Sequence, residues 1–168
     1  HSQIELGKLL GNGAFSCAYA IKNIKTDEKN KEKYDSNSLV VKVLRPKLAE
    51  QPAMLAACAA DIAIEGQLLS VLNHRNVISL KAMSPLGISA FHNGRHDAFF
   101  LVMERLEGTL ADRIQRWKKS SKGMFGKLKK SDMLTEQVTA ISELSSAIKY
   151  LHSKRILHRD LKPANVGF

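Results

Sequence analysis

A short run of β-branched residues with one lysine inside it, LVVKVL at residues 39–44, places the strongest constraint on the fold. Its length and its valines predict a buried strand. Burying the ammonium group of Lys42 alone would be costly, so the lysine must either reach solvent from an edge strand or meet a carboxylate. Glu65 is the obvious candidate, because an acid among alanines and isoleucines in the middle of a predicted helix also needs a partner.

The patterns around this strand predict an α+β fold in which a small sheet comes first and a helical part follows. Residues 4–21 alternate in polarity around a glycine-rich centre and indicate two strands joined by a turn. Residues 52–72 open on a proline, are rich in helix formers and predict a helix. Two further strands are expected within 77–87 and 98–106, separated by a polar link with an Asn-Gly turn signal.

The last third of the chain is predicted to be mostly helical. Residues 108–119 begin a short helix, and a basic stretch interrupts it. Residues 135–152 give the clearest amphipathic pattern, and Thr135 is expected to cap that helix. The apolar face of this helix consists of Val138, Ile141, Leu144, Ile148 and Leu151.

The net charge of +10, from 26 basic and 16 acidic residues, is concentrated in one stretch. Between Arg113 and Lys130 there are eight basic residues and no acidic one. The aromatic residues of this stretch, Trp117 and Phe125, do not form a repeating platform for base stacking, so no nucleic-acid partner is expected. Two interpretations stay open: a solvated insertion, and a docking patch for an acidic partner.

Three features bear on the compartment. No apolar run approaches the roughly 20 residues that cross a bilayer, so no membrane span is expected. The N-terminal segment from His1 has neither an initiating methionine nor the apolar centre of a signal peptide, so we expect a fragment or a processed product. Cys17 and Cys58 are too few and too isolated for a disulfide framework, which favours a reducing, intracellular and cytoplasmic setting.

The string HRDLKPAN at residues 158–165 brings together three groups suited to phosphoryl transfer. Asp160 can accept a proton from an attacking hydroxyl. Lys162 can neutralise charge on a transferring phosphoryl group, and the amide oxygen of Asn165 is a hard ligand suited to Mg²⁺. Charged residues around a proline mean little by themselves, whereas these groups in this order are a strong signal.

The string LGNGAFSCA at residues 10–18 is a weaker signal. Gly11 and Gly13 permit a sharp turn that brings backbone N–H groups close to phosphate oxygens, but ordinary hairpins use such glycines too. No GK[ST] sequence occurs, which excludes a P-loop nucleoside triphosphatase. A Rossmann fingerprint would need a helix directly after the glycines, where a strand is predicted.

Together, these segments resemble the eukaryotic protein kinases of the serine/threonine type. LGNGAFSCA resembles the glycine-rich loop over ATP, LVVK the strand with the phosphate-binding lysine, and EGQLLSVLNHRNVI the helix glutamate with the turn after it. FLVMERLEGTL resembles the strand into the hinge, and YLHSKRILHRDLKPAN the helix that runs into the catalytic loop. These five motifs occur in the kinase order and cover nearly the whole chain.

The resemblance implies ATP-dependent phosphorylation of serine or threonine hydroxyls on proteins, with ATP and Mg²⁺ bound. Lys42, paired with Glu65, would hold the α- and β-phosphates. Asp160 would orient and deprotonate the substrate hydroxyl, Lys162 would support the γ-phosphate, and Asn165 would bind magnesium. The glycine-rich loop, the adenine pocket, the gatekeeper Met103 and the hinge would supply the other nucleotide contacts: Leu10, Gly11, Asn12, Gly13, Ala14, Phe15, Ser16, Ala18, Val40, Met103, Glu104 and Leu106.

The resemblance also implies a division into lobes, with some departures from the family pattern. Residues 1–103 would form the N-lobe, and residues 104–168 the hinge and an incomplete C-lobe. Gly167 stands where a larger apolar residue usually forms the floor of the adenine pocket. No DFG motif follows Asn165, so we expect a piece of a longer kinase that is inactive alone. The alternative is a non-catalytic, pseudokinase-like or regulatory binding fragment.

Overall fold

The chain forms two compact units. The computed structural model describes residues 4–24, 36–84, 89–91, 94–122 and 129–168. The first unit comprises His1–Asn73 and Ile78–Arg105, and the second comprises His74–Val77 and Leu106–Phe168. The predicted division into functional lobes at residues 103 and 104 stays a prediction.

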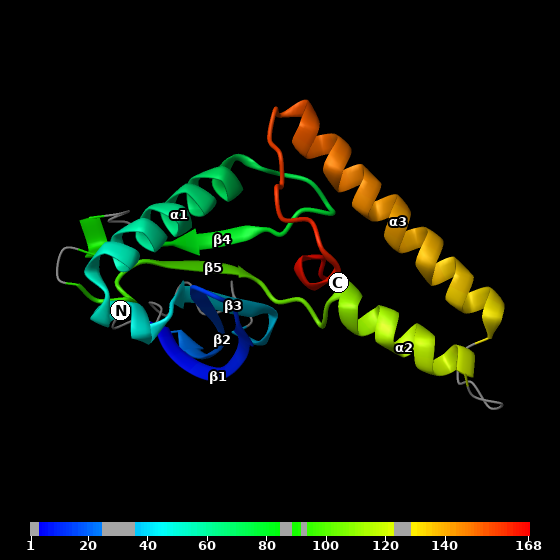
Figure 1. Ribbon diagram of the computed structural model, residues 1–168, viewed down its shortest axis with the longest axis horizontal. Coiled ribbons are helices and arrows are strands. Elements are labelled where there is room, and N and C mark those ends of the chain that lie inside the picture. Colours follow the sequence, from blue (N-terminus) through cyan, green and yellow to red (C-terminus); the bar gives the residue numbers. More distant parts are fainter. Residues whose placement is uncertain (1–3, 25–35, 85–88, 92–93, 123–128) are drawn as a thin grey trace. The chain divides into compact units, whose positions relative to one another are not determined.

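The first unit contains a five-stranded antiparallel sheet with the strand order β1-β2-β3-β5-β4 (Figure 1). The predicted α+β class is confirmed. The two strands expected within 77–87 and 98–106 are present but shorter than their patterns suggested, and Asn93 of the turn signal between them lies outside the described residues. The strands are β1 (Ile4–Asn12), β2 (Ser16–Ile24), β3 (Leu39–Leu44), β4 (Leu80–Met83) and β5 (Phe100–Glu104).

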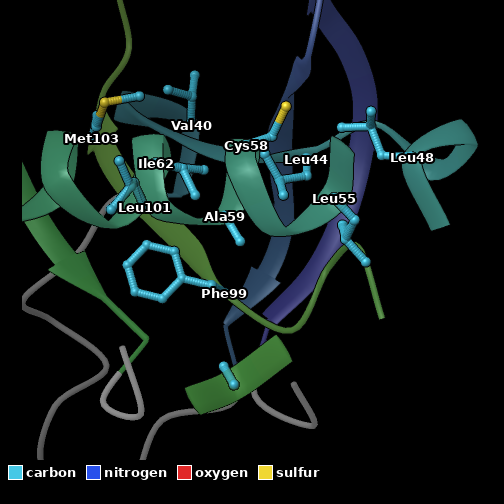
Figure 2. Close-up of a cluster of buried hydrophobic side chains, with 11 residues drawn as sticks. Val40, Leu44, Leu48, Leu55, Cys58, Ala59, Ile62, Phe99, Leu101 and Met103 are labelled. Atoms are coloured by element: carbon cyan, nitrogen blue, oxygen red, sulfur yellow. The ribbon is translucent and has the colours of Figure 1, made fainter. Parts of the chain in front are cut away.

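Helix α1 (Pro52–Val71) packs against one face of this sheet. Because side chains alternate along a strand, Val40, Lys42 and Leu44 of β3 lie on the same face. Val40 and Leu44 are buried in a cluster with Ile62 of α1, which Figure 2 shows. Lys42 lies between these two residues on the strand, and it is therefore directed towards α1.

Gly66 allows α1 to approach the sheet closely. A Cβ atom at this position would lie 2.7 Å from Leu101 Cδ2 and 3.3 Å from Met83 Sδ, which is closer than ordinary packing allows. Leu101 is completely buried, so it has little room to move aside. The glycine therefore keeps its neighbour Glu65 within reach of the strand.

Helix α1 bears on the expectation that no segment spans a membrane. It is 20 residues long and, by length and composition alone, apolar enough to cross a membrane. The core helix of a soluble protein passes the same test. We interpret α1 as a core helix, because Leu55, Cys58, Ala59 and Ile62 are buried in the cluster that packs on the sheet.

The second unit contains helices α2 (Leu110–Lys122) and α3 (Lys130–Ser153). A reciprocal cap starts α2: Asp112 Oδ2 accepts hydrogen bonds from Thr109 N (2.8 Å) and Thr109 Oγ1 (2.6 Å), and Asp112 N donates one to Thr109 Oγ1 (3.3 Å). Helix α3 begins before its predicted start, and the prediction that Thr135 caps it is wrong. Thr135 lies inside the helix, where its Oγ1 donates a hydrogen bond to Ser131 O (3.0 Å).

The apolar face predicted for α3 is only partly buried within the described residues. Leu151 is 9% exposed, whereas Val138 and Ile141 are 58% and 66% exposed. Leu134 extends this exposed strip by one turn towards the start of the helix. The sequence period therefore identifies the apolar face of α3, but it does not identify what covers that face.

The carboxylate of Glu136 joins α2 to α3. Glu136 Oε2 accepts hydrogen bonds from Trp117 Nε1 and from Arg116 Nη2, both at 2.8 Å. The bond from Trp117, with the charge of Arg116 nearby, holds the pKa of Glu136 below its ordinary value, although partial desolvation opposes the shift. Arg116 of the basic stretch is thus engaged inside this unit.

Acid titration of Trp117 fluorescence is expected to report this contact. Trp117 is the only tryptophan in the chain. Because the pKa of Glu136 is lowered by folding, its stabilising contribution is present above the ordinary glutamate pKa and is lost as the pH falls through the lowered value. The emission should therefore change below about pH 4.3, and Glu136→Gln should remove this change. Glu143→Gln on the same helix is the control, and a transition that persists in Glu136→Gln would contradict the assignment.

Candidate active site

Lys42 of β3 and Glu65 of α1 form an ion pair within the first unit. Lys42 Nζ lies 2.6 Å from both Oε1 and Oε2 of Glu65. The two side chains are 24% and 38% exposed, so the pair is partly shielded but still reaches solvent. Since β3 lies between β2 and β5, Lys42 is not on an edge strand. The structure therefore brings together the two side chains that the sequence analysis matched.

The glycine-rich segment forms the turn between β1 and β2. Gly13 N donates a hydrogen bond to Ser16 O (2.9 Å), which closes the turn. Its tip, residues 14–15, is exposed, and the Phe15 side chain is 52% exposed. In the β2–β3 ladder, Ala18 is paired opposite Lys42. The glycine-rich turn and the lysine thus belong to neighbouring parts of one sheet.

The residues beside this turn are held by the β1–β2 ladder. Gly11 is paired opposite Ala18, and Asn12 opposite Cys17. Asn12 Oδ1 also accepts a hydrogen bond from the buried thiol of Cys17, with a sulfur–oxygen distance of 3.5 Å. Leu10 is 41% exposed, so its apolar surface is open to a ligand. Asn12 therefore supports the turn through its side chain.

Arg45, the residue that follows β3, contacts the same turn. Its Nη1 lies 3.4 Å from the carbonyl oxygens of both Gly13 and Ala14, and its backbone N donates a hydrogen bond to Phe15 O (3.0 Å). The sequence alone does not indicate this role of Arg45, because backbone carbonyls carry no sequence signature. The one available signal was a basic residue directly after a buried strand.

The end of β5 carries the predicted gatekeeper and the start of the hinge. Met103 is 6% exposed and is paired opposite Val40, and both belong to the core cluster that includes α1. Glu104 Oε1 accepts a hydrogen bond from Ser79 N (2.7 Å), and Glu104 N donates one to Ser79 O (3.2 Å). The Glu104 side chain therefore supports the chain just before β4.

In the second unit, Leu106 packs against Gly167. A Cβ atom at residue 167 would lie 2.3 Å from Leu106 Cδ1, so the leucine fills the space that a larger residue would need. Gly167 is also paired with Thr109 in an antiparallel bridge. Next to it, the guanidinium of Arg113 lies 3.4 Å from the centre of the Phe168 ring. Leu106 therefore occupies the space beside the small residue at position 167.

Asp160, Lys162 and Asn165 lie together in the second unit. Asp160 Oδ2 accepts hydrogen bonds from Lys162 Nζ (2.8 Å) and Asn165 Nδ2 (2.9 Å), and Asn165 Nδ2 also donates to Asp160 O (2.9 Å). The hydrogen bonds from Lys162 and Asn165 hold the pKa of Asp160 below its ordinary value, and the bond from Lys162 contributes most. The result is an exposed, ionised carboxylate whose direction is fixed by two neighbours.

The backbone also fixes the direction of this carboxylate. Arg159 has a φ of 62°, which non-glycine residues rarely adopt, and Asp160 N donates a hydrogen bond to His158 O (2.8 Å). Pro163–Asn165 then form a single 3-10 turn, η5, in which Asn165 N donates to Lys162 O (2.8 Å). Strain of this kind persists where the surrounding structure holds it, and it is common at functional sites.

The donor groups fit an anionic nucleotide, and they fit a hard cation in part. Asn165 uses its Nδ2 hydrogens on Asp160, so its Oδ1 is the atom left for a metal ion. Within the part of the chain that the structure describes, no cluster of three or more His, Cys, Asp or Glu residues could hold a metal by itself. The residues present therefore suit Mg²⁺ that is also coordinated by phosphate oxygens, its usual mode of binding.

Known proteins that resemble the chain agree on its family. The model of the protein kinase domain matches residues 4–167. The relatives include the probable serine/threonine-protein kinase pXi of Dictyostelium discoideum, which is 26% identical over 99% of this chain and 19% of its own length. The putative ribosomal protein S6 kinase alpha-2 of Caenorhabditis elegans is 30% identical over 95% of this chain and 16% of its own length. The CBL-interacting serine/threonine-protein kinase 12 of Arabidopsis thaliana is 27% identical over 96% of this chain and 26% of its own length.

The chain therefore spans between 16% and 26% of the length of these relatives, while nearly all of it takes part in each match. The matched region contains the Lys42–Glu65 pair and the Asp160 loop, so the family match and the geometry concern the same residues. The chain belongs to the protein kinase family.

Proposed function

We propose that these residues form the nucleotide-binding part and the catalytic loop of an enzyme that transfers the γ-phosphoryl group of ATP to serine or threonine hydroxyls of proteins. The observation that carries this proposal is the Asp160 carboxylate, which Lys162 and Asn165 hold at 2.8 and 2.9 Å. An aspartate in this loop can receive a substrate hydroxyl, and the adjacent ammonium and amide match the charge that phosphoryl transfer must stabilise.

The first unit supplies the groups that would bind the nucleotide. Glu65 fixes the Lys42 ammonium through both carboxylate oxygens, so the cation is held in one place to receive the α- and β-phosphates. The turn closed by Gly13 and Ser16 offers backbone N–H groups to the phosphates. Electrostatic groups that are already in place cost no reorganisation when the reaction occurs, which is why this preorganisation favours catalysis.

The second unit supplies the groups that would act on the substrate hydroxyl. Because its pKa is lowered, Asp160 is a weak base, and its main contribution is to accept a hydrogen bond from the hydroxyl and so direct the oxygen. As the hydroxyl oxygen bonds to the γ-phosphorus, the bond from that phosphorus to the β,γ-bridging oxygen breaks and ADP leaves, while the hydroxyl proton moves to the Asp160 carboxylate. Lys162 balances negative charge beside the same carboxylate. Asn165, through its Oδ1, would help to hold Mg²⁺, which would supply neutralisation of the phosphate charge.

Two measurements test the proposal. The first is calorimetric titration of MgADP into the 168-residue chain, which should show binding that Lys42→Met weakens. The second is phosphate transfer from γ-labelled ATP to a mixed protein substrate, with the longest natural product that carries these residues. We expect labelled phosphoserine and phosphothreonine; label on tyrosine alone, or a chain that does not bind MgADP, would contradict the proposal.

The basic stretch between Arg113 and Lys130 supports a second, narrower proposal, a docking patch for an acidic protein. Lys119, Lys129 and Lys130 are exposed. Arg113 and Arg116 are engaged within the unit, by Phe168 and Glu136, so they contribute less to such a patch. A variant with these three lysines changed to glutamate should bind acidic polypeptides more weakly than the wild type, and equal binding would contradict the patch.

A further inference from the structure

We infer that Arg45 is a positioning residue that orients the backbone N–H groups of the glycine-rich turn for phosphate binding. The inference rests on the proposed nucleotide site, and it adds a residue that none of the five kinase-like motifs contains. It follows from the contacts between Arg45 and three consecutive carbonyl groups at the tip of the turn.

These three carbonyl groups all face the same residue. Arg45 Nη1 lies 3.4 Å from Gly13 O and 3.4 Å from Ala14 O, and Arg45 N donates a hydrogen bond of 3.0 Å to Phe15 O. The two side-chain contacts are long for hydrogen bonds, but the donor is charged, which strengthens them. The backbone contact continues the β2–β3 pairing, so it holds the loop close to the end of β3.

The geometry of the peptide bond converts these contacts into an orientation of the donors. In a trans peptide, the C=O of one residue and the N–H of the next point in opposite directions. The described chain contains no cis peptide bond. With the carbonyls of residues 13–15 directed at Arg45, the N–H groups of Ala14, Phe15 and Ser16 are directed away from it. Successive N–H groups arranged in this way form a concave site for anions.

Without such a restraint the turn would be free to lose this alignment. Gly13 permits many backbone conformations, and fixing even a few dihedral angles on binding costs conformational entropy. A side chain that holds the carbonyls in advance removes part of that cost before the ligand arrives. Arg45 therefore acts on phosphates through the turn, and its effect should depend on the presence of phosphate groups in the ligand.

The experiment compares MgADP with adenosine, which lacks phosphates, in calorimetric titrations of the full chain. Arg45→Met keeps the aliphatic stem but removes the donors and the charge. It should weaken MgADP binding by about three- to tenfold and leave adenosine binding unchanged. Arg45→Lys keeps the charge and a donor, so it should weaken MgADP binding less. The matched control is Lys47→Met, which removes an exposed charge two residues further along and should behave as the wild type.

Each outcome discriminates between explanations. Equal loss of MgADP and adenosine affinity in Arg45→Met would indicate general damage to the fold and overturn the inference. An equal effect of Lys47→Met would indicate a general effect of charge and overturn it as well. If the wild type binds MgADP and Arg45→Met binds it as tightly, the inference alone fails. If the wild type binds no MgADP, the proposed function fails, and the inference fails with it.

Discussion

Replacing Asp160 with asparagine is expected to lower kcat for phosphate transfer by about 10²- to 10⁴-fold, the usual contribution of a positioned acid–base group, while the affinity for MgADP stays unchanged. Asparagine has nearly the same shape and can still contact Lys162 and Asn165, but it carries no charge and cannot take up the hydroxyl proton. The measurement is the initial rate with the longest natural product that carries these residues and a serine- or threonine-containing substrate.

The control for this substitution is Asp132→Asn in the first turn of α3. Asp132 is exposed and accepts a hydrogen bond from Ser131 Oγ (3.1 Å), so the change removes the same charge from the same unit without touching the Asp160 loop. Its rate should equal that of the wild type. A near-normal rate in Asp160→Asn, or a loss that merely follows weaker nucleotide binding, would argue against a role for Asp160 in the transfer step.

The pH dependence of the reaction should reflect the same contacts. Lys162, and then Asn165, hold the pKa of Asp160 below its ordinary value. A carboxyl whose pKa is lowered by folding contributes stability above its unfolded pKa and loses that contribution as the pH falls through the folded value. Since Asp160 must be ionised to accept the hydroxyl proton, we expect its protonation to limit kcat/KM only below about pH 3.9, the ordinary aspartate pKa. A limb of the pH profile near neutral pH must then belong to another group.

The parts of the fold that could be predicted from the sequence are those in which a local pattern carries the physical reason. LVVKVL is strand β3 because β-branched residues suit a pleated, buried strand, and α1 begins at Pro52 because proline tolerates the first helical turn. The match between Lys42 and Glu65 was also available, since each charge needed a partner in apolar surroundings.

The parts that could not be predicted depend on contacts between distant residues. Thr135 resembles a helix cap, but the α3 helix starts at Lys130 and continues through it. The sequence suggests that Arg113 and Arg116 are free cations. In the structure, Arg113 stacks on Phe168 and Arg116 binds Glu136. Neither aromatic nor acidic partner lies three or four residues from its arginine, so the helical period of the sequence does not indicate these contacts. The contacts of Arg45 were hidden for the same reason, because the partners of its side chain are backbone atoms of a turn 31 and 32 residues earlier in the chain.

The second large effect is expected for Lys42→Met, which should reduce kcat/KM by about 10²- to 10³-fold. The substitution keeps the length of the side chain, so the position between Val40 and Leu44 remains filled. It removes the ammonium that Glu65 holds at 2.6 Å. Because both side chains are partly exposed, the loss of the ion pair should cost about 1 kcal/mol of stability or less, too little to unfold the chain. Rates and thermal unfolding should be measured on the same preparations.

Lys22→Met is the matched control, since Lys22 also forms an ion pair in this sheet, with Glu5, but both side chains of that pair are mostly exposed. It should leave kcat/KM unchanged. A decisive comparison adds Glu65→Gln to each background. If Glu65 acts only by holding Lys42, then Glu65→Gln lowers kcat/KM in the wild type and has no further effect in Lys42→Met. Independent losses in the double variant would mean that Glu65 has a separate role, and that the pair is not the unit that binds the phosphates.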